Sequence, residues 1–284
     1  GDYIPFIIFV GTLFIVAGGI HIRSSFAGTP ILNATMLFIG ALLANLMGTT
    51  GAAMLLIRPL IKANERRQYR MHTFIFFIFI VANIGGSLTP LGDPPLFLGF
   101  LRGVDFFWTT QYLFLPMIST VIFLLAIYTM IDLYFYRKED HTLLHSGEKS
   151  PFKVEGCINI FASLVLTPKA VREANQFTWE PILEVGKLFF GIFACIVPVL
   201  EMLRAGHAGA FAPLVALVSN ADGTFNNHMF FWLTGSLSAF LDNAPTYLAF
   251  FNLAGGDAQT LMHVDSHTLM SISMGSVFMG AMTY

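Results

Sequence analysis

The segment Asn83-Ile-Gly-Gly-Ser-Leu-Thr-Pro-Leu-Gly-Asp-Pro-Pro-Leu96 constrains the fold of this chain more than any other, because apolar runs flank it on both sides. It contains two adjacent glycines and three prolines, which interrupt the hydrogen-bond ladder of a helix. Non-helical backbone inside a bilayer is tolerated only where protein or a water-filled cavity surrounds it, and an acid such as Asp93 is costly there. The segment therefore predicts a broken helix that carries a polar site within a membrane.

Composition supports the membrane class. Of the 284 residues, 55% are hydrophobic and 11% are charged, whereas a soluble domain has about 25% charged residues. The net charge is -2 and the basic residues form no stripe, so we expect no binding of nucleic acid. Cys157 and Cys195 lie in different segments without metal-ligand spacing, and we expect both to be inert.

Apolar runs of about 20 residues predict membrane-spanning helices. They occupy residues 4–22, 71–100 with the interruption above, 106–131, 182–203 and about 267–284. Because the chain begins and ends in apolar runs, we expect a fragment of a longer protein. Residues 4–22 also lack the charged leader and the cleavage site of a signal peptide.

Two further apolar stretches carry polar residues at their centres. Residues 31–57 contain Gly48-Thr49-Thr50-Gly51, and residues 225–254 contain Asp242-Asn243-Ala244-Pro245-Thr246. We interpret each stretch as a re-entrant hairpin of two half-helices whose tip reaches the middle of the membrane. A single tilted span with a glycine kink is the alternative for each.

The basic residues favour the hairpins. If the predicted spans alternate, all 15 Lys and Arg residues except Arg102 and Arg204 fall on one side. Such a bias marks the cytoplasmic side. A simple crossing at 31–57 would divide the basic clusters between the two sides.

A weak internal repeat organises the chain. A shift of 194 positions aligns Thr49 with Asn243, Gly86 with Gly280 and Thr89 with Thr283. Because an odd number of crossings separates the halves, the second copy enters from the opposite face, as in secondary transporters built from inverted repeats. We therefore expect an all-α membrane protein, an inverted-repeat secondary transporter with two re-entrant hairpins and discontinuous helices. The predicted parts are a first repeat at 1–136, a cytoplasmic connector at 137–180 and a second, truncated repeat at 181–284.

Asp93 is the first candidate for a coupling group. It precedes Pro94 and Pro95, a pattern that is also typical of a helix N-cap followed by proline. Burial favours the protonated acid and the helix dipole favours the carboxylate, so such a group is suited to exchange a proton for a cation. The two roles are compatible.

Asp242, at the second tip, is the other acid predicted at membrane depth, and it too fits either a helix cap or cation binding. Sodium, like calcium and magnesium, is a hard cation that prefers oxygen ligands. Hydroxyls, amides and backbone carbonyls near the tips and the break are candidates: Gly48, Thr49, Thr50, Asn83, Gly85, Gly86, Thr89, Asn243 and Thr246. Asn45 and Asn83 fit a plain hydrogen bond between helices equally well.

The remaining polar side chains favour simpler interpretations. The tryptophans lie near expected span ends and are typical of interfacial anchors. Six histidines, His72 among them, also lie near span ends. A pH-sensing role would need a partner, and none is evident from the sequence.

The break motif and the tip motif Leu241-Asp-Asn-Ala-Pro-Thr246 resemble those of the ion transporter superfamily, specifically its sodium/proton antiporter branch near the citrate and arsenite-pump-like permeases. The resemblance covers nearly the whole chain. It implies two inverted repeats, two re-entrant hairpins and a homodimer in the bacterial cytoplasmic membrane. It also implies cation sites at Gly48-Thr49-Thr50 with 83–93, and at Asp242-Asn243 with Gly280 to Thr283. The chain departs from the family where helices before residue 1, part of the second broken helix and two spans between the repeats are missing.

Sodium/proton exchange is the leading hypothesis, with sodium as the transported ion and no other cofactor. Cation-coupled uptake of citrate or another carboxylate is the alternative, although both predicted sites carry an acid, which disfavours a free anion. An intramembrane aspartyl protease is the least favoured, because Pro90-Leu91 precedes Gly92-Asp93 and Asn-Ala-Pro follows Asp242. We do not expect an enzyme.

Overall fold

A computed structural model of the protein describes residues 3–18, 21–23, 27–139, 153–155, 178–220 and 223–280. The predicted site residue Thr283 and most of the predicted connector 137–180 lie outside the described residues.

Helices form most of the described chain. In chain order they are α1 (Tyr3–Gly18), α2 (Pro30–Ala63), α3 (Met71–Ile80), the 3-10 helix η1 (Ile84–Leu88), α4 (Pro94–Leu101), α5 (Trp108–Tyr136), α9 (Glu180–Arg204), the 3-10 helix η3 (Gly206–Ala208), α10 (Ala212–Val218), α11 (Asn227–Phe240), α12 (Asn243–Leu253), α13 (Ala258–His263) and α14 (Ser266–Phe278). The mostly helical prediction is confirmed. One antiparallel strand pair, β1 (His21–Arg23) with β2 (Lys153–Glu155), was not predicted.

The chain divides into two compact units. Unit 1 contains residues 1–8, 87–117 and 183–284, and unit 2 contains residues 9–86 and 118–182. The units therefore do not follow the order of the predicted repeats, because unit 1 takes residues 87–117 from the first half. The inverted relation between the halves stays a prediction.

Four segments among the described residues are long and apolar enough to cross a membrane: Pro30–Ala63, Met71–Leu88, Trp108–Tyr136 and Ile182–Leu203. The predicted spans 106–131 and 182–203 correspond to α5 and α9. The predicted interruption of 71–100 is present, since α3 ends at Ile80 and α4 begins at Pro94.

The predicted span 4–22 is wrong at its end. The helix α1 ends at Gly18, the first residue of the pair Gly18-Gly19, and His21–Arg23 pairs with β2. Adjacent glycines weaken a helix because they carry the largest conformational entropy.

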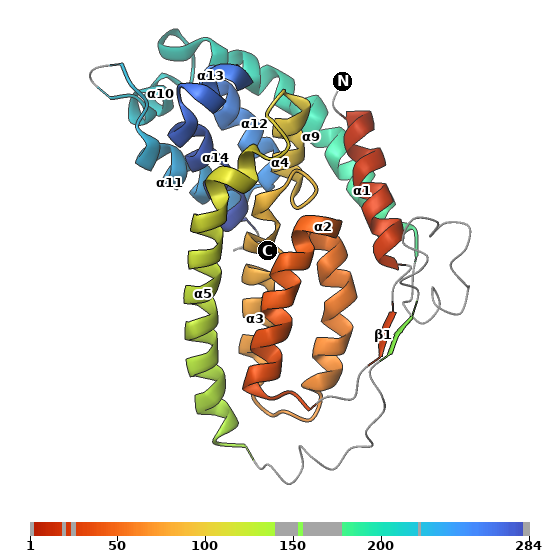
Figure 1. The fold of residues 1–284 in the computed structure, drawn as a ribbon. Coiled ribbons are helices and arrows are strands. Elements are labelled where there is room, and N and C mark those ends of the chain that lie inside the picture. The colour runs from red at the N-terminus through yellow and green to blue at the C-terminus, as the bar shows by residue number, and fades with distance from the viewer. Residues whose placement is uncertain are drawn as a thin grey trace. The chain divides into compact units, whose positions relative to one another are not determined.

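The helix α2 is a hairpin within unit 2. A straight helix of its 34 residues would separate its ends by about 50 Å. Instead, Asn33 and Asn64 exchange two side-chain hydrogen bonds of 2.8 and 2.9 Å. The bend lies at Gly48, with φ 79° and ψ 155°, and Figure 1 shows the two arms side by side. The predicted tip is therefore a real reversal of the chain, and its re-entry into a membrane stays a prediction.

Unit 1 contains the second hairpin. The chain reverses between α11 and α12 at Leu241 and Asp242, and the rings of Phe230 and Phe250 lie 6.1 Å apart across the two helices. The helix α14 packs closely on α11, where Ser238 Oγ donates to the carbonyl of Ser276 at 2.7 Å. Small residues permit this approach.

We expect the stability of the first hairpin to be most sensitive to substitution at Gly48. Its backbone lies in a region that is essentially restricted to glycine, so Gly48→Ala should cost about 1–3 kcal/mol. We expect a lower melting temperature for the detergent-solubilised protein.

Gly191→Ala is the matched control for this experiment. Gly191 lies within α9 and nothing occupies the space around an added Cβ within 4 Å. Alanine there should be neutral or stabilising, because alanine favours helix more than glycine does. Equal melting temperatures for the two variants would contradict the hairpin geometry.

Candidate functional site

Asp93 lies at the start of α4, and its carboxyl group is directed toward α12. The backbone carbonyl of Asp93 accepts from the N–H groups of Leu96 and Phe97, as that of an N-cap residue does. Its side chain makes no capping bond. Instead, Oδ2 accepts a 2.8 Å hydrogen bond from Nδ2 of Asn243, and the residue is only 4% exposed. The structure thus joins two predicted site residues that are 150 positions apart.

Asp242 uses its carboxyl group on its own helix. Its Oδ1 accepts from the N–H of Ala244 at 2.9 Å, and its backbone carbonyl accepts from Oγ1 of Thr246 at 2.9 Å. Asp242 is therefore the side-chain N-cap of α12, one of the two roles that the sequence allowed. The positive end of the helix dipole favours a carboxylate in this position.

The helices α4 and α12 therefore both begin at an acid. Asp93 precedes α4 and Asp242 precedes α12, and α12 packs against α4. The Asn243 amide that bonds Asp93 belongs to the residue directly after Asp242. The first turn of α12 thus connects the two acids.

The break between α3 and α4 also leaves backbone carbonyls without helical hydrogen bonds. Two of them accept hydrogen bonds from other groups of the protein. In unit 1 the carbonyl of Leu88 accepts from the hydroxyls of Thr109 and Thr110 at 2.9 and 2.6 Å. The carbonyl of Thr89 accepts from the N–H of Gly92 at 2.9 Å, which closes a turn. These two carbonyls already accept hydrogen bonds from the protein.

Ser87 is a further candidate ligand, and it was not predicted from the sequence. Its Oγ is buried and has no hydrogen-bond partner in the described structure. A buried hydroxyl without a partner is costly, so an oxygen-seeking cation or a water molecule would be favoured there. Its position inside the segment 83–96 is the sequence feature that could have indicated it as a ligand.

The first predicted tip and the start of the break share unit 2. Gly48 forms the bend, Thr49 is buried and Thr50 is exposed. Nδ2 of Asn83 donates to the carbonyl of Ile78 at 2.8 Å, which closes the last turn of α3. A side chain on Gly85 would lie 2.6 Å from Cα of Ala41, so the backbone there touches the first arm of α2.

The other predicted ligands are placed as follows. The N–H of Gly86 donates to the carbonyl of Asn83 at 3.0 Å. Thr246 is buried in the first turn of α12. Gly280 lies just after α14. Nδ2 of Asn45 donates to the carbonyl of Ala41 at 3.2 Å, within its own helix. Cation binding at these residues stays a prediction.

Comparison with known proteins gives one family. The model of the family described as "Putative citrate transport" matches residues 1–164 and 159–284. The chain belongs to this family. No curated protein and no solved structure matches the chain.

Membership in this family indicates that the chain is a transporter. The family is a transporter family and not an enzyme family, and with the apolar helices it indicates an integral membrane transporter. The sodium/proton antiporter branch stays a prediction.

The two roles of Asp242 can be separated by substitution. Asparagine caps helices as well as aspartate does, so Asp242→Asn should retain the melting temperature and remove the charge. Asp242→Ala removes both and should cost about 1 kcal/mol of stability.

We expect Asp242→Asn to reduce cation-dependent transport in proteoliposomes if Asp242 binds a cation. Unchanged transport by Asp242→Asn, together with destabilisation by Asp242→Ala, would leave Asp242 with the capping role alone.

Proposed function

We propose that the protein is a secondary active transporter in which Asp93 binds the coupling cation. The supporting observation is a carboxyl group, 4% exposed, that is held by the neutral amide of Asn243. The amide satisfies one acceptor site but adds no charge. Binding of a proton or a sodium ion would therefore neutralise a buried carboxylate, which is costly in its charged form.

Exchange of sodium for protons follows if the two ions compete for the Asp93 carboxylate. A carboxylate that holds a proton cannot hold sodium at the same time, so each ion displaces the other. If only the occupied states permit the site to change sides, sodium movement is coupled to proton movement without further machinery. Sodium/proton exchange in a bacterial cytoplasmic membrane by a homodimer is the form that we propose first.

Asp93→Asn tests this role. Asparagine has nearly the same shape but no charge to exchange, so we expect sodium-driven proton efflux from vesicles, reported by a pH-sensitive dye, to fall at least about tenfold. Such a loss corresponds to about 1.4 kcal/mol, a modest cost for one lost ionic ligand.

Asp257→Asn is the matched control. Asp257 is exposed and caps α13 through the N–H of Thr260 at 2.8 Å, a role that asparagine can fill. Hydrogen bonds from Thr260 hold the pKa of the Asp257 carboxyl below its usual value, so this acid is charged throughout the assay. If Asp93→Asn exchanged ions as fast as Asp257→Asn, the assignment of Asp93 would be wrong.

The family match favours a second candidate, cation-coupled transport of citrate or another carboxylate. The N-termini of α4 and α12 offer partial positive charge to an anion. The acids at both N-termini oppose a free anion, and an anion complexed with a metal ion would relieve that opposition.

Labelled citrate distinguishes the two candidates. For a citrate transporter we expect proteoliposomes to accumulate citrate when a sodium or proton gradient is imposed, and Asp93→Asn to prevent it. For an exchanger we expect dye-reported proton movement on addition of sodium without citrate. Ion exchange in the absence of citrate, with no citrate uptake, would exclude the second candidate.

A further inference from the structure

The loop after α2 and the end of α5 form a basic surface in unit 2. Five exposed Lys and Arg side chains lie in residues 61–70 and 131–139, whereas Glu65 is the one exposed acid in these two described segments. We call the five side chains the basic patch, and the proposed transport role does not use them. They are Lys62, Arg66, Arg70, Arg137 and Lys138.

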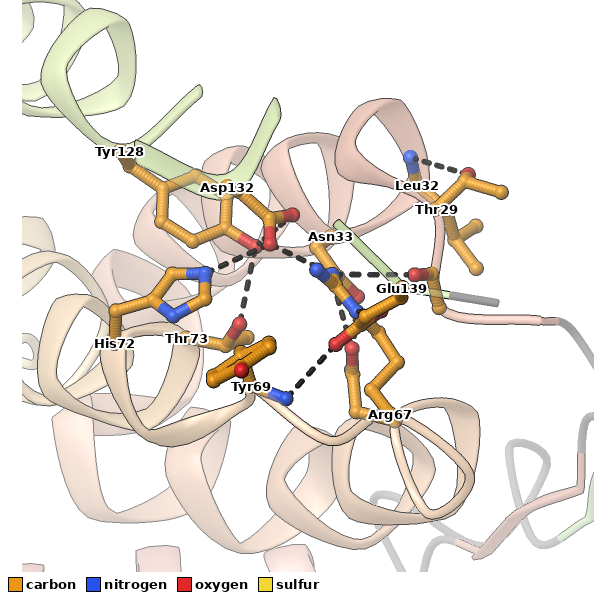
Figure 2. A network of polar contacts seen from close by, with 12 residues as sticks. Thr29, Leu32, Asn33, Arg67, Tyr69, His72, Thr73, Tyr128, Asp132 and Glu139 are labelled. Carbon is orange, nitrogen blue, oxygen red and sulfur yellow. Dashed lines mark hydrogen bonds and ion pairs between the residues drawn. The ribbon is translucent and has the colours of Figure 1, made fainter. Parts of the chain in front are cut away.

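Buried contacts hold the two segments together, as Figure 2 shows. The N–H of Tyr69 donates to Oε1 of Glu139 at 2.8 Å, and Nε of Arg67 lies 3.0 Å from Oε2 of the same carboxylate. The ring of Tyr69 stacks on the ring of Phe135 at 5.0 Å. The loop after α2 therefore lies against the end of α5, although 70 positions separate Tyr69 from Glu139.

The other acids of these segments are turned inward. Asp132 and Glu139 are buried, and both contact Arg67, whose NH1 lies 2.6 Å from Oδ1 of Asp132. The guanidinium balances part of their charge inside the protein. Since the two segments contain six basic and three acidic residues, their outer surface remains positive. The buried contacts also hold the positive charges in place before any ligand binds, which lowers the entropic cost of binding.

The basic patch lies where candidate membrane spans begin and end. The span Pro30–Ala63 ends within the first segment, Met71–Leu88 begins directly after it, and Trp108–Tyr136 ends within the second. Tyr69 and Tyr134 belong to the same segments and are exposed. Tyrosine is enriched where helices pass from the hydrocarbon region to the headgroups. The fold therefore presents these basic side chains at the depth of the lipid headgroups.

A lipid phosphate is the ligand whose chemistry fits this surface. Groups of about four to eight Lys and Arg residues next to a membrane span attract anionic headgroups. An arginine can hold a phosphate through two hydrogen bonds, and a lysine adds a compact positive charge. Nζ of Lys138 donates to the hydroxyl of Tyr134 at 2.7 Å, so an interfacial tyrosine orients one of these charges.

We propose that the basic patch binds the phosphate headgroup of an anionic phospholipid and thereby stabilises the loop at the base of the α2 hairpin. The binding surface lies within unit 2 and is separate from Asp93 and Asn243. The inference does not depend on which ion or substrate is transported.

Phosphatidylglycerol tests the proposal when it is added to the 284-residue chain in an uncharged detergent. At about ten times the dissociation constant we expect the melting temperature to rise by about 3–6 °C. The rise should diminish between about 50 mM and about 500 mM salt, because salt screens the attraction. Phosphatidylcholine, which has no net charge, should give no such rise. Equal rises with the two lipids would overturn the proposal, and so would an equal rise with inorganic phosphate alone.

Arg70→Gln combined with Arg137→Gln removes one charge from each segment. We expect this variant to bind phosphatidylglycerol about 30-fold more weakly in a titration of the melting temperature. Arg102→Gln combined with Lys187→Gln is the matched control, because it removes the same charge from unit 1. The control should bind as the unsubstituted protein does. An unchanged affinity of the patch variant would contradict the assignment.

A second pair of substitutions keeps the test decisive should the first variant fail to fold. Lys62→Gln combined with Lys138→Gln removes two other charges of the basic patch and should weaken binding by a similar factor. Native mass spectrometry provides an independent measurement, since it counts the phosphatidylglycerol molecules that remain bound. We expect fewer on the patch variants than on the control, and equal numbers on all of them would refute a lipid site at this surface.

Discussion

A helix that breaks in apolar surroundings leaves backbone groups that need partners, and this requirement accounts for much of what surrounds the break. Asn83 donates to the carbonyl of Ile78 where α3 ends, and Thr109 and Thr110 donate to the carbonyl of Leu88. Asp242 accepts from the N–H of Ala244 where α12 begins. Asn83 and Asp242, which the sequence predicts as ion ligands, therefore also form structural hydrogen bonds. The ion site that we propose would use other oxygen atoms.

The local features were predictable because glycine and proline act on the backbone of their own residue. The interruption of 71–100, the reversal at Gly48 and the reversal near Asp242 all lie where the sequence placed them. The end of α1 and the strand pair β1 with β2 were not predicted, since the partner of His21 is Glu155, far along the chain. Hydrophobicity alone did not reveal that pairing.

Contacts between residues far apart in the chain could not be predicted from a single sequence. Asp93 and Asp242 have the same local pattern, an acid shortly before proline at a helix start, yet only Asp242 caps its own helix. The difference is due to Asn243, which lies 150 positions from Asp93 and bonds it. In the same way, the partner of His72 is 60 positions away on α5. No spacing rule connects such residues, because the packing of helices decides which of them meet.

The two buried acids Asp93 and Asp132 show how their surroundings assign different tasks to the same chemical group. Asp132 is paired with the permanent charge of Arg67, and this buried ion pair links α5 to the loop after the α2 hairpin. Asp93 receives a hydrogen bond from the uncharged amide of Asn243, and we propose that a cation or a proton binds there. These different contacts are the reason why we assign Asp132 to structure and propose Asp93 for exchange.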